Sequence, residues 1–253
     1  MQQFKCYGDR RNKGFCVHCG GPDETDDHVP SKVLLDEPYP ENLPVVPACS
    51  KCNAGFSLDE EYFACLIECA RTGSVDTVER PKVRRILSDR PALSERLKQA
   101  RTVSDSGAVN YGCEAERIKR VVLKLARGHA AYELSEQRCG DPSHFMAAPL
   151  HTLSSEARSH FEEVPSSSAL PEVGTRAMQR VVVLAAWNTT IDDGWIEVQA
   201  GRYRYFAVAD GAAVMVRIVV GEYLACEVIW GEEDDDGGED KEVYRRGESC
   251  VLL

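Results

Sequence analysis

The stretch CVHCGGPDETDDHVPSK, residues 16–32, decides the N-terminal part of the fold, because it joins a zinc-type cysteine pair to an acid-rich loop. Cys16 and Cys19 form the first CxxC pair, and Cys49 and Cys52 in CSKC form a second one. Two thiolates two residues apart reach one ion from a tight turn, and two such turns complete a tetrahedral four-sulfur site. The spacing therefore predicts a structural zinc ion.

Zinc would stabilise residues 1–57, which are rich in Pro, Gly and Cys and too irregular for a long helix. A structural zinc site contributes on the order of 10 kcal/mol to folding. Four sulfur ligands leave no open position for substrate, so catalytic groups must lie elsewhere. His18 could replace a thiolate as a ligand, but with four cysteines present it is expected to be exposed. The other cysteines are expected to be small buried residues or unpaired thiols: Cys6, Cys65, Cys69, Cys113, Cys139, Cys226 and Cys250.

The composition of the 253-residue chain, with 43% hydrophobic residues, allows a packed core. No apolar run approaches the roughly 20 residues that cross a bilayer, and the N-terminal MQQFKCYGDRR lacks the apolar stretch of a secretory signal. We therefore expect a cytoplasmic protein without membrane contact. The net charge of -11 argues against a protein that coats nucleic acid indiscriminately, although residues 76–140 carry 14 Lys and Arg against 9 Asp and Glu.

The predicted fold class is α+β, with three regions along the chain. Residues 1–75 form a small zinc-stapled domain, residues 76–165 a helical and locally basic region, and residues 166–253 an antiparallel β-rich region. Within them, a helix is expected over about 58–72, started by the capping-box spacing of residues 57–60. Amphipathic helices are expected over 79–103, with a break near Pro91, and over 113–138.

The C-terminal region contains short β-branched or aromatic runs separated by turn-like DDG, AG, DG and GE, which predicts hairpins. The expected strands include QRVVVLAAWNTT (179–190), RYRYFAVA (202–209) and YLACEVIW (223–230). Tyr203, Tyr205 and Phe206 either stack on bases or, as is more usual in strands, belong to the core. The acidic run 232–242 is expected to be a solvated loop.

The combination of DDHVP with Asn42 in ENLPVVP and Asn53 after the second cysteine pair resembles the HNH, or ββα-metal, nuclease family. The resemblance covers about residues 14–60. It implies that His28 is the general base, that Asp27 and Asn53 hold a catalytic Mg²⁺ or Mn²⁺, and that Asn42 steadies the loop. The last motif position is asparagine here, where many members have histidine.

These residue types suit phosphodiester hydrolysis. A histidine with a pKa near 6.5 can activate water at neutral pH, and a divalent ion held by oxygen ligands stabilises the charge that develops at phosphate. The expected function is therefore metal-dependent hydrolysis of nucleic acid, with DNA as the expected substrate, in a bacterial or phage defence setting. The alternative is a zinc-dependent binding or assembly protein without chemistry, in which the same residues only shape turns.

Two further surfaces bear on partners. The basic middle region offers candidate phosphate contacts, with solvated helix faces as the alternative: Arg84, Arg85, Lys119, Arg120, Lys124 and Arg127. The β-rich C-terminal region is too acidic for DNA contact, and its expected role is in a homodimer or in binding a regulatory partner.

Overall fold

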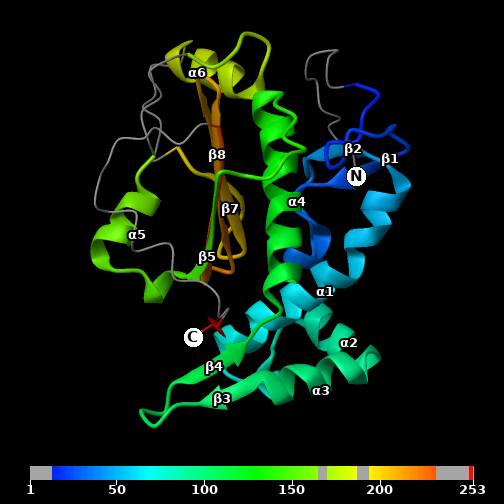
Figure 1. The fold of residues 1–253 in the computed structure, drawn as a ribbon, viewed down its shortest axis with the longest axis vertical. Helices are drawn as coiled ribbons and strands as arrows, with labels where there is room; N and C mark the ends of the chain where they lie inside the picture. Colours follow the sequence, from blue (N-terminus) through cyan, green and yellow to red (C-terminus); the bar gives the residue numbers. More distant parts are fainter. Residues whose placement is uncertain (1–12, 165–169, 187–193, 232–250, 253) are drawn as a thin grey trace.

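Helix α4 (Ala115–Leu134) forms the middle layer of the molecule. It lies between a five-stranded sheet on one side and helix α1 with strands β1 and β2 on the other (Figure 1). Residues 121–134 are buried apart from Arg127. A helix that is covered on all sides needs apolar residues around its whole circumference, and VVLKLA (121–126) supplies them.

The structure is a computed structural model in which residues 13–164, 170–186, 194–231 and 251–252 are described. The acidic run 232–242, Cys6 and Cys250 lie outside these ranges. Within the described ranges, no helix is both long and apolar enough to cross a membrane.

Two short strands and a long helix make up the N-terminal part. Strand β1 (Thr25–His28) pairs antiparallel with β2 (Val45–Ala48) along its whole length, and α1 (Ser50–Thr72) follows β2 almost directly. Single turns of 3-10 helix lie in the connections of the chain: η2 (Lys32–Leu34), η3 (Val75–Thr77) and η4 (Leu150–Thr152).

Helix α1 begins at Ser50, earlier than predicted, and the expected capping box at residues 57–60 lies inside it. Its N-cap is Cys49, whose Sγ accepts a hydrogen bond from the backbone N–H of Cys52 at 3.3 Å. A cysteine of the second CxxC pair therefore satisfies one of the free N–H groups of the first turn. The predicted end is confirmed, because Gly73 follows with a φ of 81° that favours glycine.

Two helices and a hairpin connect α1 to α4. Helices α2 (Pro81–Asp89) and α3 (Pro91–Ala100) each begin with proline, which fits the first helical position. Strands β3 (Arg101–Val103) and β4 (Val109–Gly112) then form an antiparallel hairpin, and β10 (Val251–Leu252) pairs with β4. The predicted break at Pro91 is confirmed, whereas the hairpin was not predicted, because its strands are short.

The C-terminal part contains the predicted antiparallel sheet, and the α+β class is confirmed. Its strand order is β5-β9-β8-β7-β6. The strands are β5 (His144–Pro149), β6 (Ile196–Gln199), β7 (Tyr203–Asp210), β8 (Ala213–Val220) and β9 (Leu224–Trp230). One face of the sheet joins the core around α4, and the other packs against Phe161 of α5 (Ser155–Glu162). The edge strand β5 comes from residues before the expected boundary at 166.

The predicted strand at 179–190 is wrong over its described part, because α6 (Arg176–Ala186) is a helix. Thr175 starts this helix, since its Oγ1 accepts a hydrogen bond from the N–H of Met178 at 3.1 Å. One turn later, Arg180 pairs with Glu133 of α4 at 2.5 Å. A cap and a tertiary ion pair thus override the strand preference of three consecutive valines.

The burial of several aromatic and cysteine side chains decides between the alternatives that the sequence left open. Tyr203, Tyr205 and Phe206 are buried, so the core alternative applies and their rings are not available to bases. Cys113 is disulfide-bonded, which corrects the expectation of a thiol, and Cys139 is exposed. Among the described cysteines outside the two CxxC pairs, the buried thiols are Cys65, Cys69 and Cys226.

Helix α4 touches the N-terminal strands at very short range. A Cβ added at Gly128 would lie 2.5 Å from Cγ2 of Val29, closer than real carbon atoms approach. The missing side chain of Gly128 therefore lets the helix lie directly on the segment after β1. A small apolar cluster surrounds this contact: Val17, Val29, Val46, Ala131 and Tyr132.

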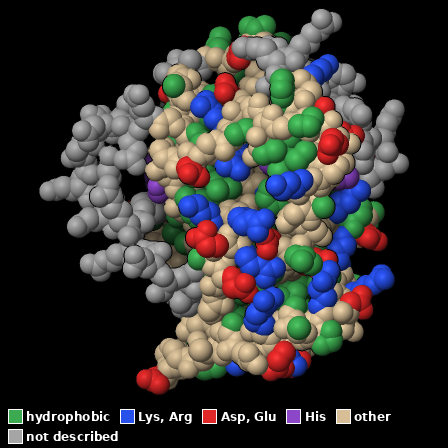
Figure 2. Space-filling model, turned by 45° about the vertical axis from the view of Figure 1, so that its right-hand side comes forward, with side chains coloured by type: hydrophobic (Ala, Val, Ile, Leu, Met, Phe, Trp, Pro, Cys, Tyr) green, Lys and Arg blue, Asp and Glu red, His purple; other side chains and the backbone are tan. Residues whose placement is uncertain are grey.

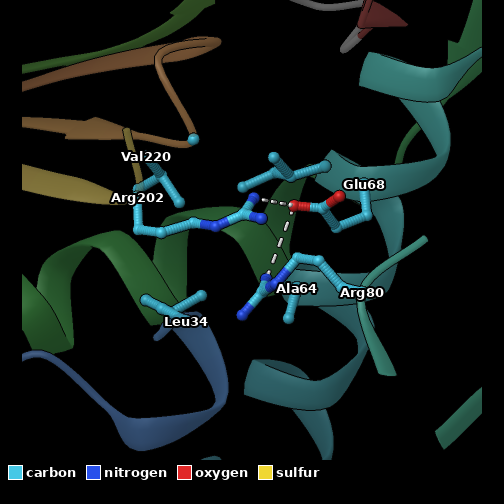
Figure 3. Close-up of a pocket in the computed structure, with 8 residues that line it drawn as sticks. Leu34, Ala64, Glu68, Arg80, Arg202 and Val220 are labelled. Carbon is cyan, nitrogen blue, oxygen red and sulfur yellow. Dashed lines mark hydrogen bonds and ion pairs between the residues drawn. The ribbon is translucent and has the colours of Figure 1, made fainter. Parts of the chain in front are cut away.

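An ion-pair network ties the N-terminal segment to α1, α2 and the C-terminal sheet. Arg80 and Arg202 place their Nε atoms 2.8 and 2.5 Å from the two carboxylate oxygens of Asp36. Both guanidinium groups also reach Glu68 of α1, at 3.5 and 3.1 Å, beside a small pocket (Figure 3). Because Glu68 and Arg80 are buried, removal of one partner would leave an uncompensated charge.

Replacing Asp36 by Asn should lower the free energy of unfolding at pH 7 by about 1–3 kcal/mol, because hydrogen bonds to two charged groups are weakened. Burial raises the pKa of Asp36, but Arg80 and Arg202 outweigh it and lower the pKa below the ordinary 3.8. Such a carboxylate stabilises the fold above pH 3.8, and this contribution is lost as the pH falls through the folded-state pKa.

Urea unfolding at several pH values measures this effect. The difference between wild type and Asp36→Asn should shrink below pH 3.8. The exposed Glu41→Gln is the matched control and should change stability little at any pH. A difference that stays constant down to pH 2, or an equal loss in the control, would contradict the assignment.

Candidate functional site

The four cysteines of the two CxxC pairs converge on one point. The first pair lies on a turn in which the N–H of Gly20 donates to the carbonyl of Cys16 at 2.8 Å, and the second pair caps α1. The four Sγ atoms all lie within 4.8 Å of one another. Sulfurs bound to one tetrahedral zinc are separated by about 3.8 Å, and the Sγ atoms of Cys19 and Cys49 are 3.8 Å apart. These residues fit a structural metal such as zinc.

The chemistry of the cysteines also suits a metal. The backbone N–H of Cys52 lowers the pKa of the Cys49 thiol to about 7. Cys49 is therefore shifted toward the thiolate, the form that binds zinc, whereas burial raises the pKa of the Cys16 and Cys52 thiols. Among the described residues, no other set of three or more His, Cys, Asp or Glu side chains brings its ligand atoms this close together.

The acid-rich stretch TDDH forms strand β1, and its side chains alternate between two faces of the strand. Asp27 is buried, whereas Asp26 is exposed and His28 is half-buried, as the alternation of side chains along a strand requires. Burial, together with the charge of Lys32, lowers the pKa of His28 below 6.5. The imidazole is therefore mostly neutral at pH 7.

The two asparagines of the motif lie at different places. Asn53, in the first turn of α1, donates from its amide to Oγ1 of Thr25 at 3.1 Å and to the carbonyl of Asp26 at 3.4 Å. It therefore joins α1 to the start of β1, whereas His28 lies at the other end of the strand. Asn42 is exposed in the turn before β2.

His18 is buried, and the expectation that it is exposed is wrong. Its Nε2 lies 2.9 Å from Oδ2 of Asp27, and its ring packs edge-on against Phe56 of α1. Its Nδ1 is buried without a hydrogen-bond partner among the described residues. The residue between the first two cysteines thus holds the acid of β1.

The other oxygen of Asp27 is held by Lys124 of α4. Nζ of Lys124 lies 2.9 Å from Oδ1 of Asp27 and 2.7 Å from Oγ of Ser31, and it also contacts Oε1 of Glu60. Ser31 in turn donates to Glu60 at 2.5 Å. The Lys124 side chain is only 1% exposed. Burial raises the pKa of Asp27, but His18 and Lys124 outweigh it and lower the pKa below 3.8.

The predicted catalytic divalent ion does not fit this arrangement. Both oxygens of Asp27 already contact a nitrogen donor, and the positive charge of Lys124 would repel a second cation. The amide nitrogen of Asn53 is engaged with β1. Asp27 as an ion ligand therefore stays a sequence prediction that these contacts do not favour.

The candidate phosphate-binding residues do not form a single basic patch. Figure 2 shows Lys and Arg side chains interleaved with acids on the face that it turns forward. Arg85 is exposed and pairs with Asp89 at 3.5 Å, and Arg84 is also exposed. Lys124 is buried, so its assignment as a surface phosphate contact does not agree with its position.

Three further candidates lie on α4. Arg120 is exposed but pairs with Asp59 at 2.7 Å. Arg127 donates to the backbone carbonyls of Cys139 and Gly140, at 3.0 and 3.1 Å, and so ties two segments together. Lys119 is half-buried. Arg84 and Arg85 therefore remain the best placed of the six for contact with a phosphate backbone.

Sequence reasoning missed the residues around Asp27, namely His18, Ser31, Phe56 and Glu60. One signal was present. Lys124 is the one charged residue in the apolar run VVLKLA (121–126). A lysine in this setting needs a buried acid, although the sequence does not say which one.

Comparison with known proteins identifies no relative, because no protein-family model, no curated protein and no solved structure matches this chain.

Replacing Cys52 by Ala should remove the bound zinc and unfold the N-terminal region, because a structural zinc site contributes on the order of 10 kcal/mol. Metal analysis of the purified protein measures the zinc content, and circular dichroism measures the fold. The matched control is Cys139→Ala, since Cys139 is an exposed thiol near the first pair, 3.9 Å from the position of a Cβ on Gly20. One zinc per chain in both variants would rule out the four-sulfur site.

Proposed function

We propose that the N-terminal part of this chain is a zinc-stapled ββα nuclease of the HNH type, which hydrolyses phosphodiester bonds in nucleic acid, with DNA as the substrate. The proposal rests on the resemblance of residues 14–60 and on the arrangement of β1, β2 and α1. His28 is the general base. The four cysteines form the scaffold and take no part in the chemistry.

One observation carries the proposal. An antiparallel pair of strands is followed directly by a helix, and Asn53 in the first turn of that helix is hydrogen-bonded to the strand that ends with His28. This order of elements is what the resemblance implies for a ββα nuclease. A zinc ion bound by both CxxC pairs would hold β1, β2 and α1 in this arrangement.

The chemistry assigned to His28 is the transfer of one proton. A water oxygen forms a new bond to phosphorus while the imidazole takes the water proton. The bond from phosphorus to the 3′ oxygen breaks, and this oxygen takes a proton from solvent water. The products are a 5′-phosphate and a 3′-hydroxyl end. In the family a divalent ion supplies positive charge at the phosphate. The contacts of Asp27 do not favour such an ion in this chain, so no step is assigned to it.

A second function is favoured by one specific observation. Lys124 and His18 occupy the carboxylate that the resemblance assigns to the metal, at 2.9 Å each. This arrangement supports a zinc-dependent nucleic-acid-binding or assembly protein that has lost the chemistry. The two functions differ in whether His28 is needed for more than packing.

The first test is cleavage of supercoiled plasmid and of labelled single-stranded DNA and RNA, with and without Mg²⁺ or Mn²⁺. His28→Ala should reduce the cleavage rate about 100- to 10,000-fold, because the base that activates water is lost. His160→Ala, at an exposed histidine of α5, is the matched control and should cleave like wild type. Equal cleavage by wild type and folded, zinc-loaded His28→Ala would remove His28 as the base, and no cleavage by either protein would leave the binding function as the better assignment.

A separate prediction concerns nucleic-acid affinity. Reversing both charges in Arg84→Glu/Arg85→Glu should weaken binding to a DNA duplex and reduce the slope of log affinity against log salt by about 1 to 2, because each phosphate contact releases about one counterion. Fluorescence anisotropy at several salt concentrations measures both quantities. Arg158→Glu on α5 is the control for net charge. The same slope in all three proteins would remove α2 from the binding surface.

A further inference from the structure

We propose that Lys124 is the resident cation of the candidate site. Its ammonium group occupies the oxygen-lined position beside Asp27 that would otherwise accept a divalent ion. This inference rests on the proposed function, since it concerns the same site. Its test measures metal binding and not cleavage.

The ammonium group is surrounded by three oxygen atoms. It donates hydrogen bonds to Oγ of Ser31 at 2.7 Å and to Oε1 of Glu60, and it forms an ion pair with Oδ1 of Asp27 at 2.9 Å. Two carboxylates and a hydroxyl are also the ligand types that hard cations such as Mg²⁺ and Mn²⁺ prefer. The side chains thus form a cation site whose occupant is covalently part of the chain.

The charges around Lys124 explain why a lysine is needed. Asp27 and Glu60 bring two negative charges into a region where the lysine side chain is 1% exposed. His18 holds the other oxygen of Asp27, with its Nε2 2.9 Å from Oδ2. Without Lys124 the two carboxylates would lie close together in a medium of low dielectric constant, which is costly unless a cation joins them.

Lys124 has little freedom to leave this position. It lies in the middle of α4, and its neighbours Val121, Val122 and Leu125 belong to the main apolar core. The ring of Phe56 lies 5.9 Å from the ammonium group. An ion that entered the site would have to displace a buried side chain that holds two hydrogen bonds and an ion pair. The wild-type protein should therefore take up no divalent ion at Asp27.

The test is Mn²⁺ binding, followed by the loss of the electron paramagnetic resonance signal of free Mn²⁺. Four zinc-loaded proteins are compared: wild type, Asp27→Asn, Lys124→Met and the double variant Asp27→Asn/Lys124→Met. Methionine keeps an unbranched side chain out to Cε and removes the ammonium group. Lys119→Met, on the same helix but half-buried, is the matched control. Mn²⁺ should not displace zinc from four thiolates, because these soft ligands favour zinc.

Wild type and Asp27→Asn should bind Mn²⁺ equally, whereas Lys124→Met should gain a site at least tenfold tighter that disappears in the double variant. Mn²⁺ binding by wild type that is lost in Asp27→Asn would overturn the proposal, as would a folded Lys124→Met without the new site. If Lys124→Met does not fold, Lys124→Gln replaces it. If neither lysine variant folds, the comparison of Mn²⁺ binding by wild type and by Asp27→Asn decides. A protein that cleaves no nucleic acid would still give this answer.

Discussion

The burial of polar groups on α4 is the constraint on which the arrangement of the other elements depends. A buried polar or charged group without a partner costs several kcal/mol, so each one on this helix must meet a complementary group. Lys124 meets Asp27 of β1, His129 meets the hydroxyl of Tyr203 in β7 at 2.7 Å, and Glu133 pairs with Arg180 of α6. Three polar positions along one helix thereby fix the N-terminal strands, the sheet and α6 around it.

The four-sulfur site and the ion cluster of Asp27 form one continuous structure. His18 lies between two of the cysteines, and its ring reaches the carboxylate that Lys124 holds from the opposite side. A metal that orders the first CxxC turn would therefore also set the position of β1. The stability of the metal site and the position of His28 are coupled through a single buried imidazole.

The sequence contained the α+β class, the four converging cysteines, the break at Pro91 and the end of α1, because these depend on local patterns and on ligand spacing. The start of α1 could not be predicted from the sequence, because a thiol replaces the usual cap. The helical state of α6 could not be predicted either, because an ion pair outweighs its strand preference. The partners of Asp27 were also beyond reach, since Lys124 lies almost a hundred positions away and only packing brings it to β1.

The contact between Gly128 and Val29 has a consequence for how such a sequence can change. A methyl group at position 128 would come within 2.5 Å of the valine, so alanine there requires a smaller residue at position 29 or a shift of the whole helix. A shift would pull Lys124 away from Asp27, one helical turn along the same face. Positions 29 and 128 are therefore expected to change together in sequences related to this chain.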